Sequence, residues 1–459
     1  MNRGSPGDFQ GDFPGDYEAA VAFLDRRIGD GIRPGLERIE HLLGLMGDPQ
    51  RGYPIIHVAG TNGKTTTVRM ISDILGAHGL FTGTFTSPHL HRVEDRYSVG
   101  GASFGRTHLA RAVEDVAPFV LMQEEQFGES PTYFELTAAV GMSSFATDVV
   151  DVAVIEVGMG GRWDATNVVE ADVSVITGIA MDHMSVLGET QARIAAEKAA
   201  ILKQGGTLVS GPLSDEAARV VGDQVRDTAS TWYRSGVDFE VTSAEWDERG
   251  WVATIRGIHG HYPDVVLGIH GRHQTTHLAT SVVAAEAFFD RALNPEALRE
   301  AAAMVRSPGR LEVAGLAPTV LIDGAHNEES FAGLAETIET EFAEERWVLV
   351  IGIRGDRDIA SLVAPMRGLI SRVIATRAAD PMAVDAASVA AAAGDELGAP
   401  TRVVTPVADA VEAAISSAED GEGVVVAGSL YVIGEARHAL GLENAASPVH
   451  RRFESEIGE

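Results

Sequence analysis

Hydrophobic residues in the first half of the chain occur in short continuous runs that alternate with segments of helical spacing. The runs at 55–59, 151–155 and 173–176 are apolar at nearly every position, which is typical of strands buried on both faces of a parallel sheet. Segment 64–78 instead places apolar residues on one helical face, at Val68, Ile71, Ile74 and Leu75. The order strand, glycine turn and helix therefore predicts an α/β architecture.

The second half repeats this rhythm more regularly. Apolar runs at 319–322, 347–351, 371–375, 401–404 and 423–427 are separated by helical segments, which predicts an open and largely parallel sheet. Between the two halves, residues 237–270 alternate and carry several glycines, which indicates a small antiparallel patch. Residues 274–304 are alanine-rich and helical. The sequence Arg306-Ser307-Pro308-Gly309 then breaks the helical pattern.

These patterns predict two α/β domains joined by a short linker. We expect an arm without regular structure at 1–16, a first domain at 17–305, a linker at 306–310, a second domain at 311–445 and a tail at 446–459. Clefts between domains are favoured sites for ligands. We therefore expect the functional residues at the strand ends that face such a cleft.

Composition narrows the classes of function. The chain has 459 residues, no cysteine and a net charge of −30, so disulfides and cysteine nucleophiles are excluded, and binding to nucleic acid or anionic membranes is not expected. No apolar run approaches the roughly 18 residues of a membrane span, and the N-terminus has no stretch resembling a signal peptide. We expect a soluble cytoplasmic protein that acts on small molecules.

Lysine is rare in this chain. It occurs only at positions 64, 198 and 203, and arginine supplies the other 33 basic residues. A lysine amine is a compact charge that can lose its proton and react, whereas a guanidinium stays protonated. The remaining lysines are therefore candidates for sites where arginine cannot substitute, although coding bias alone would also leave a few.

The strongest local motif lies between the run at 55–59 and the helix that follows it. Its sequence is Gly60-Thr61-Asn62-Gly63-Lys64-Thr65-Thr66. A helix N-terminus offers free N–H groups to a phosphate, Lys64 adds a positive charge, and the Thr65 hydroxyl can bind Mg²⁺. The strict pattern requires glycine where this chain has Val58, so the motif is a variant phosphate loop.

Two further segments carry candidate metal ligands. Glu156 ends the run at 151–155 and begins Glu156-Val157-Gly158-Met159-Gly160-Gly161, where a carboxylate either binds Mg²⁺ or caps the next helix. His183 follows the run at 173–176 and is either a ligand or a structural histidine. Lys198 stands fifteen residues further on, where it pairs with an acid such as Glu197 or carries a carbamate formed with CO₂.

In the second half, candidate residues follow the linker and the strand ends. Arg310 can reach a phosphate from the far side of the cleft. Asp323-Gly324-Ala325-His326-Asn327 ends one run and precedes a helix, so its side chains either face the cleft or, for Asn327, cap the helix. Ser429 ends the last run in the same way.

Taken in order, these segments resemble the folylpolyglutamate synthase and dihydrofolate synthase family of the Mur ligase superfamily. The resemblance runs from about residue 18 to 440. It rests on GLERIEHLLGLMG, HVAGTNGKTT, FTSPHL, EVGMGGRWDATN, MDHMSVLGET, AAEKAAILK, PGRLE, DGAHN and GSLYVIGEAR. It implies an N-terminal P-loop ATPase-like domain with a mostly parallel sheet and a C-terminal Rossmann-like α/β domain. It also implies a monomeric ligase that uses ATP and Mg²⁺.

The resemblance implies a role for each candidate. The phosphate loop, Arg310 and Asp323 would hold ATP, Thr65 and Glu156 one Mg²⁺, and His183 a second. Lys198 matches a family lysine that can carry a carbamate, and His326 would serve catalysis beside Lys64, His183 and Lys198. The residues that fall in the family's substrate pockets are Phe134, Asp164, Ala165 and Ser429. The implied reaction forms an acyl phosphate from a pteroate or folate carboxylate, which the amine of L-glutamate then attacks.

Three positions depart from the family pattern. His277 stands where an asparagine usually holds adenine, Glu328 replaces a proline, and Arg357 replaces a lysine. The sequence therefore leaves three hypotheses. The protein is a folate ligase, a ligase of the same architecture for another acid and amine, or a nucleotide-binding module with weak hydrolysis.

Overall fold

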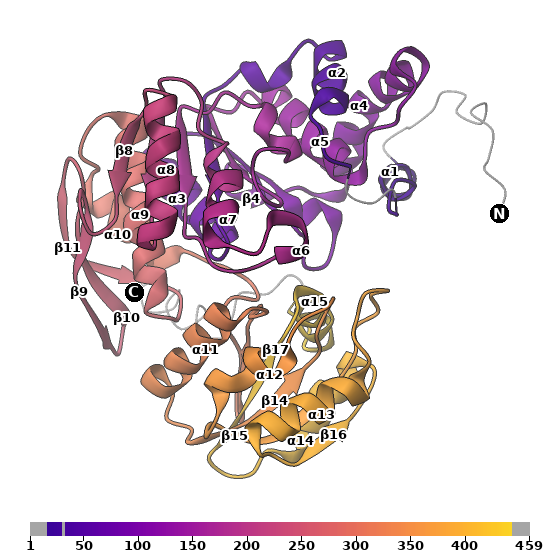
Figure 1. Ribbon diagram of the computed structural model, residues 1–459, viewed down its shortest axis with the longest axis vertical. Helices are drawn as coiled ribbons and strands as arrows, with labels where there is room; N and C mark the ends of the chain where they lie inside the picture. The colour runs from indigo at the N-terminus through magenta and orange to yellow at the C-terminus, as the bar shows by residue number, and fades with distance from the viewer. Residues whose placement is uncertain (1–15, 30–32, 443–459) are drawn as a thin grey trace.

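The computed structural model describes residues 16–29 and 33–442. The predicted tail at 446–459 and nearly all of the predicted arm at 1–16 lie outside these residues; Asp16 caps the first helix. The described chain forms three β-sheets, and the two larger ones, which have helices on both sides, are placed one above the other in Figure 1. The predicted α/β class is confirmed.

The first sheet contains eight strands in the order β4-β3-β2-β5-β1-β6-β7-β8. β1 lies between β5 and β6 and is parallel to both, and only β3 and β4 run antiparallel to their neighbours. The strands are β1 (Ile55–Ala59), β2 (Thr82–Phe85), β3 (Tyr97–Val99), β4 (Ala102–Ser103), β5 (Val152–Glu156), β6 (Val173–Ile176), β7 (Thr207–Ser210) and β8 (Thr231–Arg234).

Helices cover both faces of this sheet because its central strands are apolar on both sides. Ile56 and Val58 of β1 pack with α3 and α9, whereas Ile55 packs with α1, α2, α4 and α5. The helices of this part are α1 (Tyr17–Asp25), α2 (Glu37–Leu45), α3 (Lys64–Ala77), α4 (Arg106–Phe127), α5 (Tyr133–Thr147), α6 (Met184–Leu187), α7 (Gln191–Ala199), α8 (Asp215–Asp227), α9 (His273–Phe289) and α10 (Pro295–Met304).

The predicted antiparallel patch is a separate three-stranded sheet. It comprises β9 (Glu240–Asp247), β10 (Gly250–Arg256) and β11 (His261–Leu267), with β10 in the centre. Trp251, Ala253 and Ile255 alternate inward along β10 and join the core that α3 and α9 share. The predicted helical stretch at 274–304 is two helices, because Asn294 caps a new helix at Pro295.

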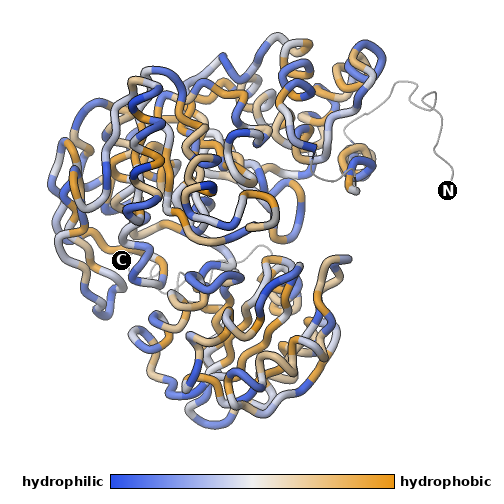
Figure 2. Tube along the Cα trace, viewed as in Figure 1, coloured by the Kyte–Doolittle hydropathy of each residue, from blue (hydrophilic) through white to orange (hydrophobic). Residues whose placement is uncertain are grey.

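The second sheet has six strands in the order β12-β13-β17-β14-β15-β16. All are parallel except β12, which pairs antiparallel with β13 at one edge. Figure 2 shows hydrophobic stretches running through the interior of both parts of the fold. In the second part, Trp347 is among the largest fully buried side chains. The strands are β12 (Glu312–Leu316), β13 (Thr319–Ile322), β14 (Arg346–Ile351), β15 (Ile370–Ala375), β16 (Thr401–Val403) and β17 (Glu422–Ala427). The helices are α11 (Glu328–Glu341), α12 (Ile359–Val363), α13 (Ala386–Leu397), α14 (Val407–Ser417) and α15 (Leu430–Ala439).

The stretch between α10 and β12 connects the two parts. The hydroxyl of Ser307 in this stretch lies 2.9 Å from the hydroxyl of Thr66 in the first turn of α3, and this hydrogen bond joins the connection to that helix. We propose that the boundaries between domains follow the predicted ones, with 306–310 as the linker.

A buried ion pair fixes α2 against α5. Arg38 donates to Glu135 from Nη2 at 2.8 Å and from Nε at 3.1 Å, and Glu135 also accepts from the Thr132 amide at 2.8 Å. Replacing Glu135 with alanine should lower the free energy of unfolding of this part by about 3–5 kcal/mol, because the buried Arg38 would lose its closest carboxylate and keep only the more distant Glu129, at 3.7 Å. Urea denaturation followed by circular dichroism measures the change.

The matched control is Glu240→Ala, which removes the carboxylate of an exposed pair with Arg256 at 3.1 Å. That change should cost less than about 1 kcal/mol. Equal losses in the two variants would contradict the importance of burial at Glu135.

Candidate functional site

The site begins where the carboxyl ends of β5, β1 and β6 lie side by side. The loop after β1 is held against the loop after β6, because the Thr61 amide donates to the Gly178 carbonyl at 2.9 Å. Gly60 has a φ of 154°, and a Cβ there would lie 1.8 Å from the Thr177 hydroxyl. A Cβ on Gly63 would lie 2.3 Å from the His277 ring. Both glycines are therefore required by close approach as well as by backbone conformation.

The two predicted magnesium ligands from the first sheet are in contact. The Thr65 hydroxyl, in the first turn of α3, donates to Glu156 at the end of β5, with distances of 2.9 and 3.0 Å to its two oxygens. The Ser87 amide donates to the same carboxylate at 3.1 Å. Burial raises the pKa of Glu156, and the positive charge of Lys64 opposes that shift. Two donors, the Thr65 hydroxyl and the Ser87 amide, thus hold a buried carboxylate at the floor of the cleft.

Two of the three lysines converge on one backbone carbonyl. Lys64 Nζ donates to the Gly60 and Thr61 carbonyls, both at 3.1 Å, and Lys198 Nζ donates to the Gly60 carbonyl at 2.6 Å. Burial and the nearby Lys64 charge lower the pKa of Lys198 to about 7. Glu197 pairs instead with Arg162, at 3.3 Å. Pairing of Lys198 with Glu197, one of the two alternatives, is therefore wrong.

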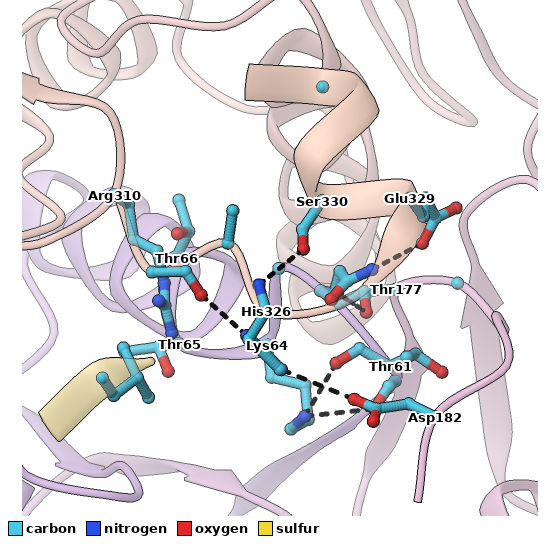
Figure 3. Close-up of a pocket in the computed structure, with 18 of the residues that line it drawn as sticks. Thr61, Lys64, Thr65, Thr66, Thr177, Asp182, Arg310, His326, Glu329 and Ser330 are labelled. Carbon is cyan, nitrogen blue, oxygen red and sulfur yellow. Dashed lines mark hydrogen bonds and ion pairs between the residues drawn. The ribbon is translucent and has the colours of Figure 1, made fainter. Parts of the chain in front are cut away.

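Asp182 is the main charged contact between the two sides of the cleft. Its carboxylate lies 3.1 Å from Arg357 Nη1 and 3.4 Å from His326 Nε2, both from the second part of the chain, and 3.9 Å from His183 Nε2. Burial opposes ionisation of Asp182, but the hydrogen bond to His326 and the neighbouring positive charges outweigh it and lower the pKa of the carboxyl. Figure 3 shows Asp182 and His326 pointing toward each other beside Lys64.

Asn327 has both of the roles that its position allowed. Its side chain accepts from the Ser330 amide at 3.0 Å and so caps α11. The same side chain donates to Asn62 Oδ1 across the cleft at 2.9 Å. Asn62 in turn donates to Glu329 at 2.5 Å. The phosphate loop is thus in direct contact with the N-terminus of α11.

Arg310, Asp323 and Ser429 occupy the side of the cleft formed by the second sheet. Asp323 accepts from the Leu311 and Ala325 amides, both at 2.8 Å. Burial raises the pKa of Asp323, and the Arg310 charge opposes the shift. The Ser429 hydroxyl accepts from the Val432 amide at 3.2 Å and caps α15.

These groups surround one cavity of about 650 Å³ between the two parts of the chain. It brings together most of the predicted site: Gly60, Thr61, Asn62, Gly63, Lys64, Thr65, Thr66, Glu156, His183, Lys198, Arg310, Asp323, His326 and Ser429. Phe134, Asp164 and Ala165 are not among its lining residues. No group of three His, Asp or Glu residues suited to a metal ion occurs in the described parts of the chain.

Known proteins resemble this chain in sequence and in architecture. Residues 58–238 match the Mur ligase middle domain, and residues 309–430 match the Mur ligase glutamate ligase domain. The dihydrofolate synthase/folylpolyglutamate synthase of Mycobacterium tuberculosis is 37% identical, over 91% of this chain and 92% of that protein. The chain belongs to the dihydrofolate synthase/folylpolyglutamate synthase family. It is accordingly an ATP-dependent ligase.

Solved structures of family members superpose on nearly the whole chain. Folylpolyglutamate synthase of M. tuberculosis, complexed with ADP and AMPPCP, gives a TM-score of 0.88 at 36% identity and covers 93% of this chain and 99% of its own. FolC of Escherichia coli, in complex with DHPP and ADP, gives 0.84 at 27% identity and covers 95% and 100%. Among the described residues, no helix is long and apolar enough to cross a membrane.

The predicted pteroate residues of this family member form a separate cluster beside the cleft. Phe134 packs against Gly158, where a Cβ would lie 2.5 Å from the ring. The Asp164 carboxylate accepts from the Met159 amide at 2.9 Å and from the Thr166 amide at 3.0 Å. Asp164 therefore shapes the loop that follows Glu156, and Ala165 is buried beside it.

Sequence reasoning missed several cleft residues of this ligase. Asp182 was passed over although it adjoins His183, and Arg357 was noted only as a departure from the family pattern. His277 was noted in the same way, and it lines the cavity against Gly63. Burial and His273 lower the pKa of His277 to about 3, so its ring is neutral near pH 7.

The pKa of Lys198 provides a direct check of this geometry. With [ε-¹³C]lysine, carbon NMR should show the Lys198 signal titrating near pH 7, well below the ordinary lysine value of 10.5. Burial lowers the pKa of Lys64 and of Lys203 as well, so the Lys198 signal has to be assigned with a variant. Because folding lowers this pKa, the group's contribution to stability should increase as the pH rises from about 7 toward 10.5.

The variant Lys198→Met assigns the signal, which must be absent from its spectrum. The Lys203 side chain is less buried than that of Lys198, and although burial lowers its pKa too, its signal should titrate above the Lys198 signal. Three signals that all titrate above pH 9.5 would contradict the burial described here.

Proposed function

We propose that the protein joins L-glutamate to 7,8-dihydropteroate and to the γ-carboxyl group of tetrahydrofolates, through an acyl phosphate. The observation that carries this proposal is the arrangement of cations around the shared cavity, with Lys64 on one side and Arg310 on the other. A carboxylate, a triphosphate and an acyl phosphate are all anionic, so a site for them must offset their repulsion. Relatives that bear both activities in their names, in M. tuberculosis and Bacillus subtilis, support the choice of substrates.

ATP is assigned to the phosphate loop. Apart from the Thr61 amide, which donates to Gly178, the loop offers its backbone amides at the N-terminus of α3, where the helix dipole favours an anion. Lys64 is placed for the outer phosphates, and Thr66 lines the same loop. Arg310 and Asp323 are assigned to the nucleotide from the opposite side. We assign His277 to the nucleobase side of the cavity, where its neutral ring offers one donor and one acceptor.

Mg²⁺ fits the pair formed by Thr65 and Glu156. Their donors are a hydroxyl and a carboxylate, which are the oxygen ligands that Mg²⁺ prefers, and Mg²⁺ commonly takes only one or two ligands from the protein. When bound, the ion supplies charge that offsets the phosphates. His183 is assigned to a second ion, and its exposed ring lies on the same wall of the cavity.

Lys198 is assigned a carbamate. A fraction of its amine is unprotonated near pH 7, which is the form that adds CO₂, and no carboxylate of the described residues forms an ion pair with it. The product is an anion beside Thr65 and Glu156, where it would contribute oxygen ligands. The negative charges of Asp182 and Asp164 each act in the opposite direction and raise the pKa of this amine, but burial and Lys64 outweigh them.

The reaction then follows from the positions of these side chains. The pteroate or folate carboxylate attacks the γ-phosphorus of ATP, the bond from that phosphorus to the bridging oxygen of ADP breaks, and Lys64 and Arg310 offset the charge. The amine of L-glutamate then attacks the acyl carbon, loses a proton and expels phosphate. His326 and Ser429 are assigned to the glutamate side, and the cluster of Phe134, Asp164 and Ala165 to the pterin side. Closure of the cleft would keep water from the acyl phosphate.

We propose that the protein acts as a monomer in the cytoplasm.

Phosphate release tests the substrates. With ATP, Mg²⁺ and L-glutamate, release should depend on 7,8-dihydropteroate or on tetrahydrofolate, and mass spectrometry should show a product heavier by one glutamyl residue. Lys64→Met should lower kcat/KM for ATP at least 100-fold, because the charge at the outer phosphates is lost. Lys203→Met, which removes a lysine outside the cavity, is the control. Phosphate release at the same rate with and without either pterin substrate would overturn the substrate assignment.

Isotope labelling tests the carbamate. In ¹³C-bicarbonate, the protein should show a carbonyl signal near the carbamate region that is absent from Lys198→Met. Removal of CO₂ from buffer and enzyme should lower kcat at least tenfold, and added bicarbonate should restore it. Full activity without CO₂ would exclude a catalytic carbamate and would leave the substrate assignment intact.

A further inference from the structure

A second cavity lies outside the cleft, on the other side of the linker. It encloses about 390 Å³ between α3, the hairpin of β2, β3 and β4, and the chain around Arg306. It shares no lining residue with the cleft. The groups that matter to its chemistry are Arg69, Asp73, Thr86, Asp95, Ser103 and Arg306. Its volume falls within the range of small-molecule sites.

Arg69 and Asp73 present opposite charges to this cavity from one face of α3. They are four residues apart on the helix, so their side chains point in the same direction. They nevertheless form no ion pair with each other. Arg69 Nη1 donates to the Arg306 carbonyl, at the long distance of 3.4 Å. The guanidinium therefore retains donors that are directed into the cavity.

Asp73 has fewer hydrogen-bond partners than Arg69. Among the residues that the structure describes, none donates a hydrogen bond to its carboxylate or forms an ion pair with it. Loss of hydration raises the pKa of Asp73 to about 6, although Arg69 and Arg306 lower it. Asp73 is half-buried, so water can solvate its carboxylate, but native proteins usually give such a group a hydrogen-bond partner. Here no described residue is that partner.

The opposite wall adds polar groups rather than apolar ones. Asp95 uses Oδ2 to accept from the His91 amide at 3.1 Å and the Arg92 amide at 3.0 Å, and its Oδ1 is given no donor by the described chain. The Thr86 and Ser103 hydroxyls also lie on this wall. The lining thus combines two guanidinium groups, two carboxylates and free hydroxyls.

We propose that this cavity binds a small zwitterion of the α-amino-acid class, with its carboxylate on Arg69 and its ammonium group on Asp73. A simple anion would meet two carboxylates, and a simple cation would meet two guanidinium groups. A zwitterion satisfies both charges at once, and the hydroxyls suit a short polar side chain. The occupant would also touch Arg306 and Pro308, so this site adjoins the linker.

Calorimetry with L-serine on the full chain tests the proposal. ADP is kept saturating so that the nucleotide site is constant. Saturable binding is expected, and L-lactate, which lacks the ammonium group, and ethanolamine, which lacks the carboxylate, should each bind at least tenfold more weakly. Arg69→Gln and Asp73→Asn should each weaken L-serine binding at least tenfold.

The matched controls are Arg226→Gln and Asp223→Asn, which alter an exposed pair on α8 and should leave the affinity unchanged. Asp73→Asn should also remove the preference for L-serine over L-lactate, a change in selectivity that misfolding would not produce. If Arg69→Gln does not fold, this selectivity decides the question. Absence of saturable L-serine binding, or equal affinity in Asp73→Asn and the unaltered protein, would overturn the proposal.

Discussion

The Gly60 carbonyl accepts hydrogen bonds from both Lys64 and Lys198, and much of the site depends on this contact. It joins the phosphate loop to α7, which follows β6, and so fixes the loop relative to two neighbouring strands. It also places two ammonium groups within the reach of one oxygen, which lowers the proton affinity of the more buried amine. A substitution that moved Gly60 would disturb the loop and both lysines together.

The second constraint is the contact between the two parts of the chain. Asp182 stands after β6, and its partners His326 and Arg357 stand after β13 and β14. Because the carboxyl ends of both sheets face the same cavity, residues far apart in the sequence meet there. A guanidinium at 357 can reach Asp182 and the His326 carbonyl at once, at 3.1 and 2.7 Å, which a single lysine amine would do with less directional precision.

The sequence was sufficient for the continuously apolar strands and for most of the cavity lining, but it did not predict β2, β3, β4 or β8 of the first sheet. Buried parallel strands such as β1, β5 and β14 are recognisable because they are continuously apolar. The edge strand β12 was missed, because Glu312–Leu316 mixes polar and small residues and pairs on one side only. Likewise, Thr65 and Glu156 could be matched from their positions at strand ends. The Asp182 contacts could not, because they depend on how the two sheets are oriented.

The environment of Lys198 has a consequence for the integrity of the protein itself. An acyl phosphate is an acylating agent, and an amine with a pKa of about 7 is a competing nucleophile for it. The 2.6 Å hydrogen bond to Gly60 directs an N–H of that amine toward the phosphate loop and restrains its rotation. A carbamate would occupy the nitrogen entirely. The hydrogen bond alone leaves the lone pair of the neutral amine available, so a carbamate would be the state that protects the ligase from acylating its own lysine in place of its substrate.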